Sequence, residues 1–257
     1  MKFELFDYVV QDKESYEAAV KALQTRYETL LAEAGQATSK LKSELLSKDL
    51  GFKELNQMIA ELETKLAKQE AGHALETKWN TRRPHTENFR YPARTLLNRS
   101  ELLKIDPRIF FTPADGDLPV INGDDPDAIA FKCLQWVHKN IKYTSDISQF
   151  KHEEEWLFAH ETLLLRNGDC DDGSILMANM MIKSGIPYWR VRLNAGLTRG
   201  GGHCFVTYLS KNEEWLILDW CYDYKSQGQP WSKAEKYFDI WFSFNSRFLF
   251  AADMLDR

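Results

Sequence analysis

The sequence has few cysteines and no close pairs of them. Its cysteines are Cys133, Cys170, Cys204 and Cys221, and no two have the short spacing that zinc sites and redox motifs show. A chain of 257 residues can build a sufficient core without disulfides. We therefore expect reduced thiols and a cytoplasmic protein, in a host cell or in a virion if a phage encodes it.

The sequence also lacks an excess of positive charge and a long apolar run. Its 33 basic and 38 acidic residues give a net charge of -5, which cannot neutralise nucleic-acid phosphates. The apolar stretch before Gln11 contains Glu4 and Asp7 and is too short and too charged for a signal sequence or a membrane span. These absences exclude nucleic acid and membranes as expected partners.

Proline is missing between Gln11 and Gln69, and this region shows helical spacing of apolar residues. Its narrow apolar stripe predicts a helical region over residues 1–72 with a coiled-coil or hairpin seam. Gly35 and the break at residues 47–51 indicate two or three segments. Either the stripe packs on the rest of the chain, or it mediates self-association or binding of a protein partner. The stripe comprises Tyr16, Val20, Leu23, Tyr27, Leu30, Leu41, Leu45, Leu55, Met58, Ile59, Leu62 and Leu66.

Residues 73–124 show no clear periodicity and carry five prolines, Pro84, Pro92, Pro107, Pro113 and Pro119. This composition predicts an irregular linker or a lead-in to a second domain. The second domain is expected to cover residues 125–257.

The pattern of residues 125–257 predicts an α+β domain, because helices precede a series of sequential antiparallel strands. Asp125 and Pro126 are typical of a helix start. Glycines at Gly196 and Gly200–Gly202 indicate turns between strands. The expected elements are helices at 125–140 and from Cys170 to Lys183, and strands at 188–193, 203–209 and 215–219.

Cys170 stands where the second helix is expected to begin. Asp169 is a good N-cap residue, and Asp172 occupies the capping-box position. The positive end of a helix stabilises a thiolate, and the Cys170 backbone N–H is a candidate oxyanion donor. The neighbouring acids, Asp171 among them, oppose this effect because like charge raises the pKa of a thiol.

His203 and Asp219 are expected on neighbouring strands. A hairpin centred near Lys211 would place the two residues directly opposite each other, with Phe205 opposite Ile217. The carboxylate would then fix the tautomer of the imidazole and leave its other nitrogen to take the proton of Cys170. This register predicts a Cys-His-Asp site.

The stretch from Trp156 to Asp219 resembles the core of the transglutaminase-like superfamily, which has a papain-like fold and includes bacterial and phage cysteine peptidases. The resemblance covers roughly residues 125–224. The motifs that carry it are Glu161-Thr-Leu, Arg166-Asn-Gly-Asp-Cys170, Gly185-Ile-Pro187, Val191-Arg192, Gly202-His203 and Trp215-Leu-Ile-Leu-Asp219. It implies that Cys170 is the nucleophile, His203 the base and Asp219 the third member.

The resemblance also implies a reaction, in which a thiolate attacks an amide or peptide carbonyl and forms a thioester. Water then gives hydrolysis and a lysine amine gives a crosslink, and the sequence does not choose between them. The expected partner is a protein or peptide substrate, and no cofactor is needed. Trp156 and Asp169 are further candidates for substrate or oxyanion contacts, although a tryptophan is more often a core residue.

Two other interpretations compete with the enzyme. A zinc site could use Cys170, His203, Cys204 and Cys221, but adjacent residues of a strand point to opposite faces. The more serious rival is a non-catalytic structural or assembly protein, for example in a phage particle, whose helical N-terminus is the interface. The aromatic tail from Pro230 is expected to form core or a clamp, with a substrate groove or a partner surface as the alternatives.

Overall fold

The computed structural model describes residues 13–47, 52–81, 85–114, 116–198, 200–222, 228–235 and 237–251. The chain divides into two compact units, residues 1–75 and 76–257. The expectation for the stretch before Gln11 concerns residues outside the described ranges. Within those ranges, none of the helices combines the length and the apolar character that crossing a bilayer requires.

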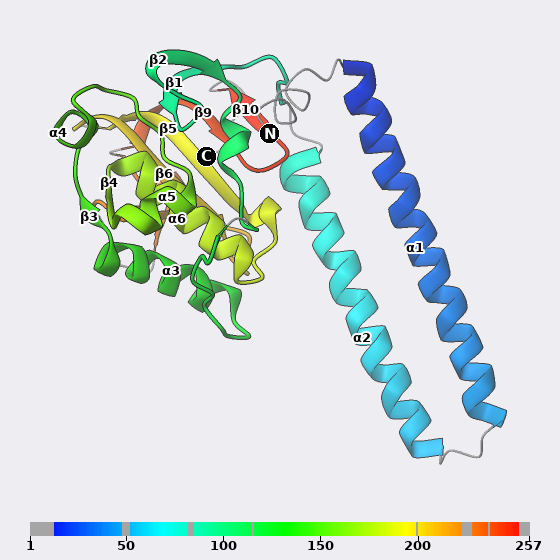
Figure 1. Cartoon of the computed structure of the whole chain (residues 1–257). Coiled ribbons are helices and arrows are strands. Elements are labelled where there is room, and N and C mark those ends of the chain that lie inside the picture. Colours follow the sequence, from blue (N-terminus) through cyan, green and yellow to red (C-terminus); the bar gives the residue numbers. More distant parts are fainter. Residues whose placement is uncertain are drawn as a thin grey trace. The chain divides into compact units, whose positions relative to one another are not determined.

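The first unit contains two long helices, α1 (Lys13–Ser47) and most of α2 (Phe52–Glu76). They run in opposite directions (Figure 1), and the rings of Tyr27 and His73 stack with centroids 5.1 Å apart. Helix α1 continues through Gly35, where the sequence indicated a break. A glycine inside a helix costs only about 1 kcal/mol, which a helix of this length tolerates.

Part of the apolar stripe of these helices is exposed. Leu30, Leu41, Met58, Leu62 and Leu66 retain between 38% and 56% of their accessible surface. The coiled-coil seam therefore stays a prediction, as does an assembly role for this region.

The second unit is built on an antiparallel sheet of six strands (Figure 1), in the order β10-β9-β5-β6-β7-β8. The sequential neighbours β5, β6 and β7 confirm the predicted antiparallel arrangement. The strands are β5 (Val191–Thr198), β6 (Gly201–Leu209), β7 (Trp215–Leu218), β8 (Gln229–Pro230), β9 (Tyr237–Phe244) and β10 (Leu249–Ala251).

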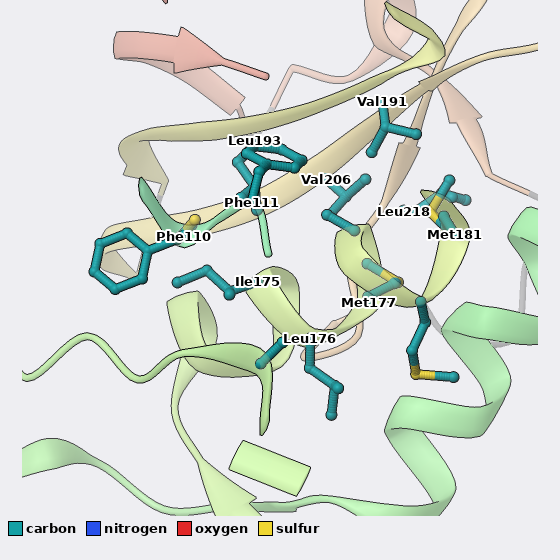
Figure 2. Close-up of a cluster of buried hydrophobic side chains, with 14 of the residues drawn as sticks. Phe110, Phe111, Ile175, Leu176, Met177, Met181, Val191, Leu193, Val206 and Leu218 are labelled. Atoms are coloured by element: carbon teal, nitrogen blue, oxygen red, sulfur yellow. The ribbon is translucent and has the colours of Figure 1, made fainter. Parts of the chain in front are cut away.

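Helix α6 (Cys170–Lys183) is the centre of the core. It packs on β5 and β6, and α3 (Pro126–Asn140) and α5 (Ala159–Leu165) pack against it in turn. Every residue of α6 from Asp171 to Met181 is buried. Figure 2 shows apolar side chains of α6, among them Ile175, Leu176 and Met177, together with Leu193 and Val206 of the strands.

Residues 91–110 contain regular structure that the sequence did not predict. Strands β1 (Tyr91–Thr95) and β2 (Asn98–Ile105) form a separate two-stranded sheet, followed by a 3-10 turn, η2 (Pro107–Phe110). Pro92 is compatible with β1 because an edge strand needs fewer backbone donors. Phe110 then enters the main core with none of its surface exposed.

The helices α3 and α6 begin where the sequence predicted, whereas one strand begins later than predicted. Asp125 caps α3 and accepts a hydrogen bond from the N–H of Asp127. The strand expected at 188–193 begins later, because residues Tyr188–Arg190 form a 3-10 turn, η3. It also runs through Gly196, where a Cβ would lie 2.2 Å from the carbonyl oxygen of Asp239. Glycine is needed there for the close approach of β9, and not for a turn.

The remaining short elements connect these parts. They are η1 (Thr77–Thr81), the parallel pair β3 (Lys142–Tyr143) and β4 (Asn167–Gly168), α4 (Asp146–Phe150), and the 3-10 turn η4 (Trp231–Lys233).

The buried position of α6 predicts a large difference between two leucine substitutions. Leu176→Ala in α6 should lower the free energy of unfolding by about 2–5 kcal/mol, because it removes a fully buried side chain. The matched change Leu164→Ala, at a side chain that is 82% exposed, should change it by less than about 0.5 kcal/mol. Urea denaturation of both variants measures the difference, and equal losses would contradict this packing.

Candidate active site

Cys170 is the first residue of α6 and is partly buried. Asp169 precedes it as the N-cap. The backbone N–H of Asp169 donates to Oδ2 of Asp172 over 3.1 Å, which is one half of the predicted capping box. The other carboxylate oxygen of Asp172 accepts the N–H of Leu157 over 2.8 Å. Asp172 therefore fixes the start of α6 from both sides.

Trp220 attaches the start of α6 to the end of β7. Its indole Nε1–H donates to the carbonyl oxygen of Cys170 over 3.3 Å. A Cβ on Gly173 would lie 2.2 Å from the Trp220 ring, so glycine lets the indole pack against the first turn of the helix. Because Trp220 follows Asp219 in the chain, this contact sets the position of Cys170 relative to Asp219.

His203 and Asp219 are hydrogen-bonded, although the predicted register is wrong. The observed pairs place Val206 opposite Leu218 and Thr207 opposite Ile217, a shift of two residues. The loop between β6 and β7 is longer than a hairpin centred at Lys211 would allow, and Glu213 in it adopts a left-handed conformation with φ 59°.

A shift of two residues keeps both side chains on the same face of the sheet. The Nε2 atom of His203 therefore still lies 2.8 Å from Oδ2 of Asp219. Both residues are buried, Asp219 completely.

Asp219 has two further donors. The hydroxyl of Tyr237 donates to Oδ2 over 2.6 Å, and the backbone N–H of Cys221 donates to Oδ1 over 2.9 Å. Burial acts to raise the pKa of Asp219, but the hydrogen bonds from His203 and Tyr237 and the charge of His203 outweigh it and hold the pKa below its ordinary value. The lowered pKa thus favours the charged form of Asp219, to which His203 is hydrogen-bonded.

The thiol of Cys170 lies beside the His203 strand. The backbone N–H of Cys204, in the peptide that joins His203 to Cys204, lies close enough to act to lower the pKa of the thiol. The sulfur also lies 3.8 Å from Oδ1 of Asp171. The structure therefore brings the three predicted residues Cys170, His203 and Asp219 into one region, at the start of α6 and the ends of β6 and β7.

The electrostatic surroundings of Cys170 favour the neutral thiol. Burial raises its pKa well above the usual value, and the charge of Asp169 adds to this effect. Burial and neighbouring charges likewise raise the pKa of Asp171 and of Asp172 well above the ordinary range. The sequence analysis expected the neighbouring acidic residues to raise the pKa of Cys170, and Asp169 is close enough to the thiol to do so.

Three of the carboxylates form a group that could hold a cation. Asp146, Asp169 and Asp172 each place an oxygen within 4.8 Å of the others. Asp146 is 7% exposed, and burial followed by the charge of Asp169 raises its pKa to about 7. Oδ1 of Asp146 and Oδ1 of Asp169 are buried and have no hydrogen-bond partner. Buried carboxylate oxygens without donors suit a hard cation such as calcium.

A second group of possible ligands lies at the histidine. His203, Asp219 and Cys221 also have ligand atoms within 4.8 Å of one another. The zinc hypothesis included His203 and Cys221, together with Cys170 and Cys204. The hydrogen bond of His203 to Asp219 already uses one nitrogen of the ring.

Trp156 lies in the hydrophobic core and is 3% exposed. Its ring packs against those of Tyr91 and Phe110, with centroids 5.1 and 5.3 Å away. The alternative that the sequence analysis gave for this tryptophan, a core residue, therefore describes its position. The aromatic residues after Pro230 are mostly core as well: Trp231, Phe242, Phe244, Phe248 and Phe250 are buried.

Exposed aromatic side chains surround the site. The ring of Tyr222, which is 53% exposed, lies 4.8 Å from that of His203. Tyr143, which is 55% exposed, lies 5.9 Å from Trp220. Sequence reasoning gave none of these residues, nor Tyr237 and Asp146, a role in the site. Tyr143 and Asp146 belong to a segment, Lys142–Asp146, that resembled only the lead-in of the family, and Tyr222 and Tyr237 lie outside the motifs. Only the high aromatic content of the tail indicated that an aromatic side chain such as that of Tyr237 could contact the site.

The contact between Gly173 and Trp220 predicts that a single methyl group disturbs the site. Gly173→Ala should lower the free energy of unfolding by about 1–3 kcal/mol and should slow alkylation of Cys170, because the indole must move away from the first turn of α6. Gly123→Ala is the control, since the nearest atom to its Cβ would be at an ordinary 3.5 Å. Denaturation and iodoacetamide labelling measure the two effects, and a Gly173→Ala variant that matched wild type in both would contradict this role.

Comparison with known proteins gives a family for the region that contains the site. No curated protein matches the chain. Among solved structures, Legionella pneumophila LapG shares 22% identity, covers 49% of this chain and 68% of its own, and has a TM-score of 0.42. Its calcium-bound form shares 21% identity over 49% and 71%, with a TM-score of 0.41.

A protein from Cytophaga hutchinsonii, provisionally described as a cysteine protease, shares 19% identity over 37% of this chain and 31% of its own, with a TM-score of 0.30. The family comparison is more specific. Residues 120–220 match the model of the transglutaminase-like superfamily, which confirms over this part of the chain the resemblance that the sequence motifs indicated.

Proposed function

We propose that the second unit is a cysteine enzyme that transfers acyl groups from amide or peptide carbonyls, with Cys170 as nucleophile, His203 as base and Asp219 as the residue that orients the base. The family match supports a cysteine peptidase-like role at the level of the superfamily. The observation that carries the proposal is the buried 2.8 Å hydrogen bond between His203 and Asp219 beside the thiol of Cys170.

The geometry assigns a role to each nitrogen of the imidazole. Because Nε2 of His203 faces Asp219, Nδ1 is the nitrogen that takes the thiol proton. The thiolate of Cys170 attacks the carbonyl carbon and forms a C–S bond, and the negative charge moves to the carbonyl oxygen. The N–H at the start of α6 is available to stabilise that oxyanion.

The second half of the reaction releases the product. When the C–N bond breaks, the imidazolium of His203 returns its proton to the leaving amine, and a thioester remains on Cys170. Water then gives an acid, whereas a lysine amine gives a crosslink. The substrate in both cases is a protein or a peptide.

A cation bound by Asp146, Asp169 and Asp172 would favour this chemistry. The charge of Asp169 adds to burial in raising the pKa of Cys170, and a divalent cation would compensate that charge. LapG has a calcium-bound form, and for this chain the unpaired buried oxygens of Asp146 and Asp169 make calcium the cation to test.

A non-catalytic assembly protein is the second candidate function. Two observations favour it: the raised pKa of Cys170 and the exposed apolar side chains of α1 and α2. In that case Cys170 would react as slowly as an ordinary buried thiol, which separates the two candidates. A phage setting stays a prediction in either case.

The proposed pair predicts that alkylation of Cys170 depends on His203. His203→Ala should slow iodoacetamide labelling of Cys170 near neutral pH by about 10-fold or more, because the thiolate loses its cationic partner. Mass spectrometry of the digest distinguishes Cys170 from the other thiols. His160→Ala, a histidine of α5, should label like wild type. Slow labelling in wild type and variant alike would favour the assembly protein.

The acidic group predicts a stability that falls with rising pH. The pKa of Asp146, about 7, lies above its ordinary value of 3.8, so the folded state holds this proton more tightly than the unfolded state. Asp146 therefore lowers stability as the pH rises from about 4 to about 7. Asp146→Asn should remove this loss and melt above wild type at pH 8 in the presence of a chelator, as differential scanning fluorimetry can show.

Calcium should act at the same residues. At pH 8, added calcium should raise the melting temperature of wild type and should not raise that of Asp146→Asn. Asp124→Asn, a change at an exposed residue, should retain the response of wild type. An equal response in all three proteins would exclude calcium binding at Asp146, Asp169 and Asp172.

A further inference from the structure

Tyr237 begins β9, in the aromatic tail for which the family match gives no role, because that match ends at residue 220. Its side chain is 2% exposed. The ring packs on Phe205 with centroids 4.5 Å apart, and lies 6.5 Å from the ring of His203. Its hydroxyl donates to Oδ2 of Asp219 over 2.6 Å. Packing of the ring thus directs the hydroxyl to the oxygen that His203 also uses.

We propose that Tyr237 is a positioning residue of the Cys170, His203 and Asp219 site: its hydroxyl keeps Asp219 ionised and aimed at Nε2 of His203. The inference rests on the proposed function, since it assigns Tyr237 a part in the same proton transfer. In this role Tyr237 acts through Asp219.

The need for this donor follows from the burial of Asp219. A fully buried carboxylate is unstable as an anion unless donors compensate the lost hydration. Asp219 has three: Nε2 of His203, the hydroxyl of Tyr237 and the N–H of Cys221. The backbone N–H of Cys221 donates to Oδ1, whereas the hydroxyl of Tyr237 and the imidazole both donate to Oδ2.

Loss of the hydroxyl would leave Oδ2 with the imidazole as its remaining side-chain donor among those that the structure describes. Removal of a hydrogen bond to a buried carboxylate raises its pKa by about one or two units. Asp219 would then take up a proton at a higher pH. A protonated Asp219 accepts less strongly from Nε2–H and can itself donate to the ring, so the tautomer that leaves Nδ1 free for the thiol is no longer fixed.

A purely structural role is the alternative, in which Tyr237 only fills space beside Phe205. Tyr237→Phe retains the ring and removes the hydroxyl alone, so it tests the hydrogen bond and not the packing. Tyr208→Phe is a matched control. Tyr208 is 1% exposed in β6 of the same sheet, and its hydroxyl donates to Oδ1 of Asp127 over 2.8 Å.

The first readout is the pH dependence of Cys170 alkylation by iodoacetamide. In Tyr237→Phe the acid limb of the His203-dependent rate should move to higher pH by about one unit, whereas Tyr208→Phe should keep the limb of wild type. In an Asp219→Asn background, Tyr237→Phe should add no further shift, because the group through which it acts has lost its charge. An unmoved limb in Tyr237→Phe would overturn the inference.

The second readout needs no reactivity. Nitrogen NMR of the His203 ring reports its tautomer and its titration: wild type and Tyr208→Phe should hold the proton on Nε2, and Tyr237→Phe should lose this preference at a pH where wild type retains it. An identical titration in Tyr237→Phe and wild type would overturn the inference. If instead the alkylation of wild type does not depend on His203, the proposed function fails, and the NMR titration still decides the role of Tyr237.

Discussion

The burial of α6 is the constraint on which the rest of the second unit depends. Its residues from Asp171 to Met181 are all inside the protein, so the sheet, α3 and α5 must pack around a helix that has no solvent face. The helix can meet solvent only near its ends. Cys170, at the first of these ends, is therefore held firmly by the core and still partly accessible.

Groups at the ends of other elements complete the site. Asp172 and Trp220 fix the start of α6, while β6 brings His203 and the end of β7 brings Asp219. Each of these polar groups is buried together with its partner, because a buried charge without a partner would cost more than the fold can tolerate. Some buried carboxylate oxygens near the start of α6 have no partner, among them one each of Asp146, Asp169 and Asp171.

Much of the site was predictable because local signals specify it. The cap at Asp169 and the capping acid Asp172 lie within three residues, and the positions of His203 and Asp219 follow from strands with clear patterns. His203 and Asp219 still meet although the predicted register is wrong, because a shift of two residues leaves a side chain on the same face of the sheet. A shift of one residue would have placed the two side chains on opposite faces of the sheet.

Contacts between distant segments could not be predicted in the same way. Tyr237 follows Asp219 by 18 residues, and Asp146 precedes Asp169 by a comparable distance with no motif to link them. The left-handed conformation of Glu213 determines the loop between β6 and β7, and glutamate gives no signal for it. The continuation of β5 through Gly196 was missed because the sequence cannot distinguish a glycine needed for a turn from one needed for the approach of another strand.

The central claim is that Cys170 and His203 form a thiolate-imidazolium pair, and the thiolate itself can be observed. The measurement is the ultraviolet difference spectrum between wild type and Cys170→Ala as the pH is raised with calcium present. The account predicts thiolate absorbance that develops below neutral pH and is lost when His203 is replaced by alanine. Absorbance that develops only at alkaline pH, with or without His203, would contradict it.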